Sequence, residues 1–379
     1  MAKKILWIIV LLISLYIGLS YRFNAQYSQS IIIAPQPQNT VKTCHAFHPS
    51  INDKNTIRVL IVDGGGIDGI MPLVILNYLE KRTGKPIYEL FDFFTGTSTG
   101  AIIVSALNIP NEIGQAKYTA EQILDLYRSV SQEVLNPPLI RKILTLNGFI
   151  APHLSIKELH EGYKKYISSN ILFGQLLKKV AITAFDINDK QMTIFNSWDC
   201  DHPITHYLAA DVITAATATP TYFSPVIFTR YSKDKPATFI DGMIFANNPS
   251  LKAIHEAFKL YPNAKKFVFV HLGTGGNSLD FLHLSASKIQ HWGILRWIFP
   301  MITILYKSQN LVIKDAIADI QNFSTTTRFE YHYFSKNLTL ASPFDTSKEN
   351  IETISKVSKE LLTEQKTKLD EVALELLQN

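Results

Sequence analysis

Two short glycine-rich segments contain the residues of this chain whose types and spacing could do chemistry. The first, Asp63–Gly69 (DGGGIDG), follows an apolar β-branched run and precedes a helical pattern. The second, Gly96–Gly100 (GTSTG), lies between an apolar run and a helical pattern in the same way, with Ser98 at its centre. A turn between a strand and a helix directs free backbone N–H groups outward from the start of the helix. A serine at one turn and unobstructed N–H donors at the other are the nucleophile and the oxyanion hole that acyl transfer requires.

The same two segments allow other interpretations. The pattern G-x-S-x-G is typical of a nucleophile elbow, but a serine at this place can also cap the following helix. Gly64, Gly66 and Gly69 form a G-x-G-x-x-G dinucleotide fingerprint, which requires an acidic residue at the end of the next strand. Glu89 has the right distance but begins the next apolar run, so the fingerprint is incomplete. A P-loop is excluded because no Gly-Lys-Ser/Thr follows either turn.

Strand-like apolar runs alternate with amphipathic helical patterns from residue 56 onward. Near-continuous apolar strands separated by helices predict an α/β protein, a three-layer fold with a central mostly parallel sheet flanked by helices. Ligands bind such sheets at the carboxyl ends of the strands, where both glycine turns lie. The predicted strands are Ile57–Val62, Leu90–Phe94, Val180–Phe185, Met192–Phe195, Ala237–Ile240 and Phe267–Leu272, and the predicted helices are Ile70–Arg82, Ala101–Leu107, Glu121–Val134, Ile156–Tyr166 and Ser250–Tyr261.

Further motifs follow the two turns in a consistent order: Ala218–Phe223 (ATPTYF), Asp241–Gly242, Asn247–Pro249 (NNP) and Leu272–Gly275 (LGTG). Together with DGGG and GTSTG, they resemble the patatin-like phospholipase family, the patatin-type lipid acyl hydrolases. The resemblance implies a patatin-like fold and a Ser–Asp dyad, in which Ser98 is the nucleophile and Asp241 its general base. It also places the oxyanion hole at the backbone N–H groups of Gly64, Gly65 and Gly66.

The activity that this resemblance implies is the hydrolysis of fatty-acyl esters through an acyl-enzyme, as in phospholipases A and lysophospholipases. It implies neither a metal nor a cofactor, and it makes a lipid or phospholipid at a membrane surface the partner. A carboxylate is a weak base for a serine, so such a dyad requires a dry and close contact.

Two residues depart from the family pattern. Asp68 stands before the last glycine of the first motif, where Arg or Lys is usual. A reversed charge there would weaken the oxyanion hole, but we favour an acid that caps the following helix and points to solvent. Met243 follows the Asp-Gly pair where a small residue is more usual, and would narrow the approach to Asp241.

Two alternative functions stay open. One is a Ser–Asp–His esterase in the chain order Ser98, Asp241, His271, since His271 ends an apolar run before a glycine turn. The other is a lipid-binding pseudoenzyme without hydrolytic activity, in which Asp68 has weakened the oxyanion site.

The N-terminus predicts an exported protein, secreted or held in the cell envelope. Lys3 and Lys4 precede the uncharged apolar run Ile5–Leu19, which matches a signal peptide and is short for a membrane-spanning anchor. The predicted organisation is a signal peptide or N-terminal membrane anchor at 1–20, a linker at 21–55, a hydrolase domain at 56–345 and a C-terminal helical segment at 346–379.

The composition of the chain limits the other functions and sites that it could have. The 37 Lys and Arg residues against 32 Asp and Glu are scattered, which argues against a nucleic-acid-binding stripe. Cys44 and Cys200 could form one disulfide or remain two thiols, and no Cys/His spacing resembles a zinc site. The apolar segment Trp292–Tyr306, which Pro300 should break, is either a packing helix or an interfacial segment that touches lipid.

Overall fold

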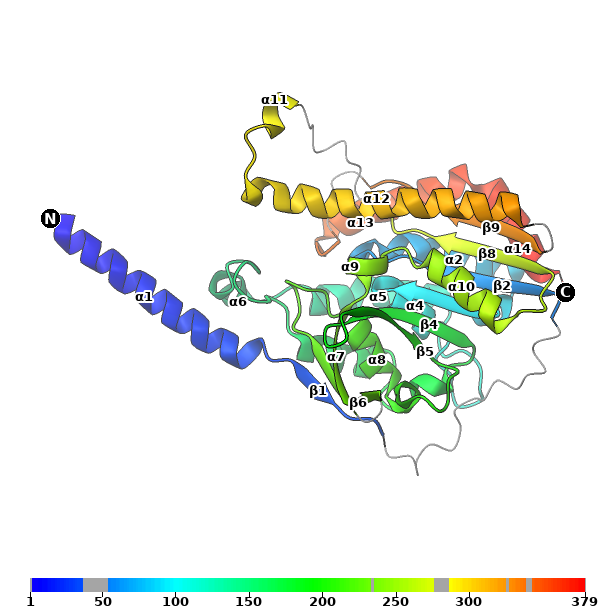
Figure 1. Cartoon of the computed structure of the whole chain (residues 1–379), viewed down its shortest axis with the longest axis horizontal. Coiled ribbons are helices and arrows are strands. Elements are labelled where there is room, and N and C mark those ends of the chain that lie inside the picture. Colours follow the sequence, from blue (N-terminus) through cyan, green and yellow to red (C-terminus); the bar gives the residue numbers. More distant parts are fainter. Residues whose placement is uncertain are drawn as a thin grey trace.

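The computed structural model describes residues 2–36, 54–232, 235–275, 286–324, 327–338 and 343–378. A nine-stranded sheet forms its centre, in the order β1-β6-β7-β4-β3-β2-β8-β9 with β5 paired to β4 (Figure 1). The strands are β1 (Ile31–Ile33), β2 (Thr56–Val62), β3 (Phe93–Thr97), β4 (Lys179–Asp186), β5 (Gln191–Asn196), β6 (Val226–Ser232), β7 (Lys235–Asp241), β8 (Lys266–Leu272) and β9 (Arg328–Phe334).

Most strand pairs of the sheet are parallel. Strands β3, β2, β8 and β9 run in one direction beside β4, whereas the pairings of β4 with β5, β4 with β7 and β6 with β7 are antiparallel. This arrangement confirms the predicted α/β fold with a mostly parallel central sheet.

Both faces of the sheet are buried, as the continuous apolar strands predicted. In β2, Leu60 and Val62 belong to one hydrophobic cluster, whereas Val59 and Ile61 belong to the other, because successive side chains point to opposite faces. Helices α10 (Ser250–Leu260) and α12 (Ile294–Phe323) contribute to the second cluster. The first cluster is built with α2 (Ile70–Thr83), α4 (Thr99–Ala106), α5 (Ala120–Val134), α7 (Ile156–Tyr166), α8 (Ala209–Ala216), α13 (Lys348–Glu364) and α14 (Lys366–Leu377).

Three strands were not predicted from the sequence: β1, β6 and β9. Strand β9 reads RFEYHYF, with polar residues between aromatic ones, because it lies at an edge of the sheet. Strand β1 forms the other edge with only three residues, inside the predicted linker 21–55, and pairs with the missed strand β6. Leu90 ends the short helix α3 (Ile87–Leu90) instead of beginning a strand.

The N-terminal helix α1 (Ala2–Tyr27) runs through the predicted boundary at residue 20 without a break. Ser20 is buried there, and its hydroxyl donates to the carbonyl oxygen of Leu144 at 2.7 Å. Among the described residues, no helix combines the length and the hydropathy that a membrane span requires. Cys200 is disulfide-bonded, and the other cysteine of the sequence, Cys44, lies outside the described residues.

Pro300 does not break the helical structure, contrary to the sequence prediction. It lies inside α12, which continues for more than twenty residues beyond it. Pro300 lies in the second turn of α12, where its ring removes one backbone hydrogen bond and crowds the preceding turn. The apolar contacts of Ile313, Ile317 and Ile320 hold the later turns against the sheet.

Candidate active site

Ser98 occupies a sharp turn between β3 and α4. Its backbone has φ 51° and ψ −117°, a combination that a non-glycine residue seldom adopts and that stores local strain. Gly96 and Gly100 make this turn possible: a Cβ atom on Gly96 would overlap the backbone of Gly100, and one on Gly100 would overlap the carbonyl oxygen of Val62. The turn therefore has the geometry of a nucleophile elbow.

Strand β4 aligns the serine with the carboxylate. Its Thr183 pairs with Thr97 of β3, and the next residue, Ala184, pairs with Asp241 of β7. Asp241 is the last residue of β7, and Ser98 directly follows Thr97. Asp241 and Ser98 therefore lie beside each other. Two residues far apart in the sequence become neighbours because a third strand lies against both of theirs.

The hydroxyl of Ser98 donates to Oδ2 of Asp241 at 2.7 Å. Asp241 is fully buried, and Ser98 is 8% exposed. The same Oδ2 accepts a second hydrogen bond from the hydroxyl of Thr219 at 2.8 Å, and Oδ1 accepts the backbone N–H of Met243 at 2.9 Å. Burial raises the pKa of Asp241 to about 6, against the lowering effect of these three hydrogen bonds. A carboxylate with this pKa is ionised at neutral pH and can accept the serine proton.

The first glycine turn faces the serine, but its three N–H groups are not equivalent. The N–H of Gly64 donates to the carbonyl oxygen of Asn247 at 3.0 Å, so it is occupied. Among the described residues, the N–H groups of Gly65 and Gly66 have no acceptor, and neither has that of Thr99 at the start of α4. The prediction that all three glycines donate to an oxyanion therefore requires correction for Gly64, because the Asn247 segment packs against its amide.

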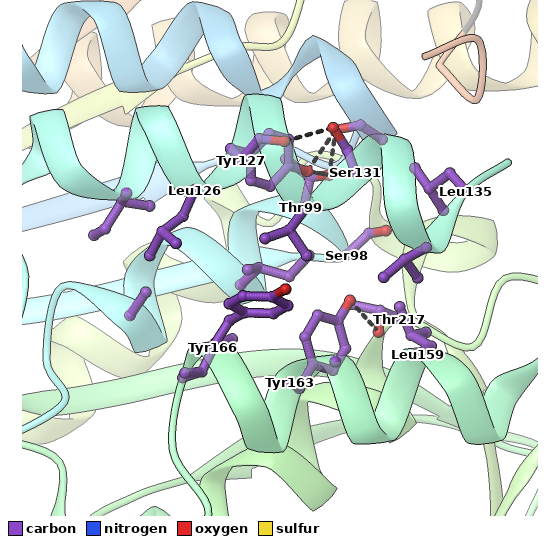
Figure 2. Close-up of a pocket in the computed structure, with 18 of the residues that line it drawn as sticks. Ser98, Thr99, Leu126, Tyr127, Ser131, Leu135, Leu159, Tyr163, Tyr166 and Thr217 are labelled. Carbon is purple, nitrogen blue, oxygen red and sulfur yellow. Dashed lines mark hydrogen bonds between the residues drawn. The ribbon is translucent and has the colours of Figure 1, made fainter.

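An apolar cavity opens beside Ser98. It has a volume of about 120 Å³ and lies between α4, α5 and α7. In Figure 2, Ser98 and Thr99 lie between one helix that carries Tyr127, Ser131 and Leu135 and another that carries Leu159, Tyr163 and Tyr166. A cavity of this character next to a nucleophile suits an extended hydrocarbon chain better than a polar substrate.

Comparison with known proteins agrees with the geometry. The model of the patatin-like phospholipase family matches residues 60–254, which contain both glycine turns, Ser98 and Asp241. The chain belongs to the patatin-like phospholipase family. The resemblance inferred from the motifs is thereby confirmed.

Curated relatives are similar along most of the chain. Patatin-like protein 2 of Arabidopsis thaliana is 30% identical over 269 residues, which are 64% of this chain and 66% of the relative. Patatin-like protein 1 of the same plant is 27% identical over 81% of both chains. The protein named Probable inactive patatin-3-Kuras 1, of Solanum tuberosum, is 29% identical over 65% of this chain and 69% of its own. A protein named as inactive is as similar to this chain as the others, so similarity at this level does not establish activity.

In this patatin-like protein, several polar side chains that the sequence analysis did not select hold the glycine turn. The carbonyl oxygen of Gly66 accepts the hydroxyls of Thr99 and Tyr127, both at 2.6 Å. That of Gly64 accepts the hydroxyl of Thr274 at 2.6 Å. Thr99 and Thr274 lie within the recognised GTSTG and LGTG motifs, whereas Tyr127 lies on a helix with no motif to indicate it.

Asp68 does not cap a helix, and its side chain does not reach solvent. It is 3% exposed, its Oδ1 has no hydrogen-bond partner among the described residues, and the N-cap of α2 is Gly69. The favoured sequence interpretation was therefore wrong, because the turn Gly66–Gly69 packs inward on Thr99 and Tyr127. Burial raises the pKa of Asp68 to about 8, so the carboxyl is mostly protonated at neutral pH.

Met243 begins the short helix α9 (Met243–Ala246), and its backbone contributes the N–H that orients Asp241. Its side chain is not among the residues that line the cavity beside Ser98. The predicted narrowing of the approach to Asp241 is not seen on that side.

His271 is not a partner of Ser98. Its Nε2 lies 2.6 Å from Oδ1 of Asp63, and its Nδ1 lies 2.7 Å from the hydroxyl of Tyr331. Both ring nitrogens of this buried residue are thus engaged, and the serine proton is directed at Asp241. The contacts give no support to a triad through His271, which instead joins β8 to the end of β2.

One group of side chains in the described residues could in principle hold a metal ion: Glu330, His332 and Glu375. The ammonium group of Lys266 already pairs with both glutamates, at 3.2 and 2.5 Å. The guanidinium of Arg328 also pairs with Glu330, at 2.5 Å, so two basic groups balance the two glutamates. The cluster shares no residue with the proposed dyad.

Proposed function

We propose that this protein hydrolyses fatty-acyl esters of lipids through Ser98 and Asp241, by a phospholipase A or lysophospholipase type of reaction. The observation that supports the proposal most directly is the 2.7 Å hydrogen bond between them at the wall of an apolar cavity. Family membership supports the substrate class, and the strained elbow supports the nucleophilic role of Ser98.

The first half of the reaction forms an acyl-enzyme. Oδ2 of Asp241 accepts the hydroxyl proton as Oγ of Ser98 attacks the ester carbonyl carbon. The carbonyl oxygen becomes an oxyanion, which the free N–H groups of Gly65 and Gly66 stabilise. The intermediate then collapses, the carbon–oxygen bond to the alcohol breaks, and the leaving alcohol takes the proton from Asp241.

The second half restores the enzyme. A water molecule attacks the acyl carbon while Asp241 accepts one of its protons. Collapse of the second intermediate releases the fatty acid and returns the proton to Oγ of Ser98. The acyl chain lies in the cavity between α5 and α7 throughout, which keeps the reacting carbonyl beside the serine.

Burial gives the dyad its base strength. Thr219 and the Met243 N–H stabilise the ionised form of Asp241, while the dry surroundings raise its pKa above the ordinary value. The opposing effects leave a carboxylate that is ionised at neutral pH yet basic enough to take a proton in the transition state.

The test is covalent labelling together with hydrolysis. A fluorophosphonate should label the unmutated protein at Ser98, and the protein should release fatty acid from phospholipid or lysophospholipid. Ser98→Ala and Asp241→Asn should each lower the rate by roughly 10³–10⁴-fold, by analogy with serine hydrolases that lose a triad member. A folded protein that is neither labelled nor active would refute the proposal.

A second function is favoured by one observation. Within the described part of the chain, Gly65 and Gly66 keep free N–H groups whereas Gly64 does not, and a buried carboxyl lies in the same turn. A lipid-binding protein without turnover would show saturable binding of fatty acid or lysolipid but no labelling of Ser98. The same labelling experiment separates the two functions.

A further inference from the structure

Three segments lie toward the end of the molecule where α1 projects (Figure 1). Each of them exposes large apolar side chains. They are α1, residues 135–150 around α6 (Leu139–Leu144), and residues 286–314, which include the first half of α12. We call these three segments the basic apolar surface. Representative exposed fractions are 75% for Trp7, 72% for Leu139, 78% for Ile294 and 54% for Leu305.

Helices α1 and α6 are joined by specific contacts. The hydroxyl of Tyr16 donates to the carbonyl oxygen of Ile143 at 3.0 Å, and that of Ser20 donates to Leu144. The guanidinium of Arg141 lies over the ring of Tyr27, 5.7 Å from its centre. The two helices therefore form one unit that leaves most of the apolar side chains of α1 uncovered.

The charges of these segments have one sign. They contain nine of the 37 Lys and Arg residues of the chain and none of its 32 Asp and Glu residues. The rest of the chain consequently carries more acidic than basic residues. Arg141 is buried against Glu158 and adds no free charge, but Lys142, Arg296 and Lys314 have no such partner in the described structure.

One of the three segments reaches the proposed active site. Leu135, in the second segment, lines the cavity beside Ser98. The loop after α6 reaches His153, whose ring contacts Tyr222, and Tyr222 stacks on the cavity residue Phe344 at 3.6 Å.

Helix α12 provides a second connection to the site. The side-chain amide of Asn248 donates to Oδ1 of Asn310 at 3.0 Å. The preceding residue, Asn247, holds the N–H of Gly64 in the glycine turn. Helix α12 is thus attached to the segment that holds the first glycine turn.

We propose that the basic apolar surface binds an anionic lipid bilayer and sets the cavity beside Ser98 against it. Exposed aliphatic side chains accompanied only by basic ones match a surface that offers hydrocarbon beneath negative head groups. Trp292 and Trp297, with ring centres 5.3 Å apart, add the amphipathic rings that favour such an interface. A second copy of the chain would bring like charges together, so the bilayer is the partner that the charges favour.

The inference goes beyond the proposed reaction, because binding requires no turnover. It is tested with full-length Ser98→Ala protein, so that lipid is not consumed. Co-sedimentation is measured with phosphatidylcholine vesicles and with vesicles that also contain phosphatidylglycerol. Binding should favour the anionic vesicles and weaken as salt is added.

Two sets of substitutions locate the surface. Leu139→Gln, Ile294→Gln and Leu305→Gln together should weaken vesicle binding by at least about 30-fold, since each removes an apolar side chain from the lipid. Lys142→Gln with Arg296→Gln should weaken binding to anionic vesicles by roughly 25-fold, about fivefold for each charge. Matched controls on other elements are Leu251→Gln with Leu374→Gln, and Lys252→Gln, which should bind as the parent protein does. Thermal melting verifies that every variant is folded.

Equal binding by the surface variants and the controls would overturn the inference. So would a dimer that forms without vesicles and dissociates on the same substitutions, because a second copy would then cover this surface. Fluorophosphonate labelling of the unmutated protein reports on Ser98 separately. A protein that binds vesicles but is not labelled refutes the proposed function and leaves the bilayer surface standing.

Discussion

Ser98 and Thr219 donate to the same oxygen atom, Oδ2 of Asp241, at 2.7 and 2.8 Å. The proposed nucleophile therefore shares its proposed base with a second hydroxyl, from the segment that precedes β6. When the serine proton is transferred, the hydrogen bond from Thr219 remains and determines which oxygen of Asp241 faces the nucleophile. Thr219 is a positioning residue in this arrangement, and it leads to the first prediction.

Replacing Thr219 with valine should raise the pKa of Asp241, because a hydrogen bond that stabilises the carboxylate is lost. The acid limb of the kcat/KM profile should move upward by about one pH unit, the size expected for one hydrogen bond to a charged group. Thr219→Ser restores the hydroxyl and should restore the profile. An unchanged acid limb in the valine variant would mean that Thr219 has only a packing role.

The unmutated enzyme should lose activity as the pH falls through about 6. Below that pH Asp241 is protonated and cannot accept the proton of Ser98, so the rate should fall about tenfold for each further pH unit. The measurement is kcat/KM against pH on a soluble ester whose own charge does not change. A rate that stays constant down to pH 4 would place the base elsewhere.

The ionisation of Asp68 should lower the free energy of unfolding, whereas the ionisation of a salt-bridged acid raises it. Its pKa is near 8 in the folded protein and near 3.8 when unfolded, so the unfolded state binds fewer protons between these values. This group therefore makes the folded protein less stable as pH rises from about 4 to about 8, by about 1.4 kcal/mol per pH unit.

Asparagine at position 68 does not titrate. Asp68→Asn should therefore reduce the loss in the free energy of unfolding between pH 5 and pH 8, as measured by urea denaturation. The substitution should also extend activity at alkaline pH, because ionised Asp68 adds negative charge to the turn that we propose holds the oxyanion. Glu349→Gln, on α13, is an exposed control that should leave both profiles unchanged. A stability profile identical to that of the unmutated protein would show that Asp68 titrates normally.

His271→Asn distinguishes a dyad from a triad. A triad predicts a loss of roughly 10⁴-fold in rate, whereas the structure predicts a small effect on fluorophosphonate labelling and a marked loss of stability. The destabilisation should be about 3–5 kcal/mol, because Asp63 is left buried without its ring partner. Labelling of Ser98 below the melting temperature is the decisive measurement, and loss of labelling in folded protein would restore the triad.

The size of the cavity should determine which acyl-chain lengths the protein hydrolyses fastest. Gly162 lines it on α7, and a Cβ there would lie 3.3 Å from Cγ2 of Val134. Gly162→Leu should lower the rate on long-chain esters by tenfold or more, about the effect of losing two buried methylenes. Short-chain esters, which leave the cavity partly empty, should be much less affected. Lys157→Leu, on the exposed side of the same helix, is the matched control, and an equal loss on both substrates would argue for another acyl site.

Helix α7 could be predicted because its buried residues form one stripe at helical spacing. Strands β2 and β8 could be predicted because they are buried on both faces and therefore read as apolar runs. Both patterns are local in the sequence. Strand β9 could not be predicted, because a strand at the edge of a sheet does not need a continuous apolar run. Strand β1 is apolar but only three residues long, too short to show a periodicity. The roles of Thr219 and Tyr127 were hidden for a different reason. Threonine and tyrosine are common, and only the packing of distant elements shows which ones meet a catalytic group.

The sequence by itself determined the two glycine turns, the serine at the second of them and the order of the family motifs, since these depend on residue type and short spacing. Only the tertiary structure decided that β4 lies against both β3 and β7, and so places Asp241 beside Ser98. It also decided that Asp68 is buried and that the amide of Gly64 is occupied. Burial and hydrogen-bond partners are properties of the packed chain, because they depend on residues that the sequence separates by tens or hundreds of positions.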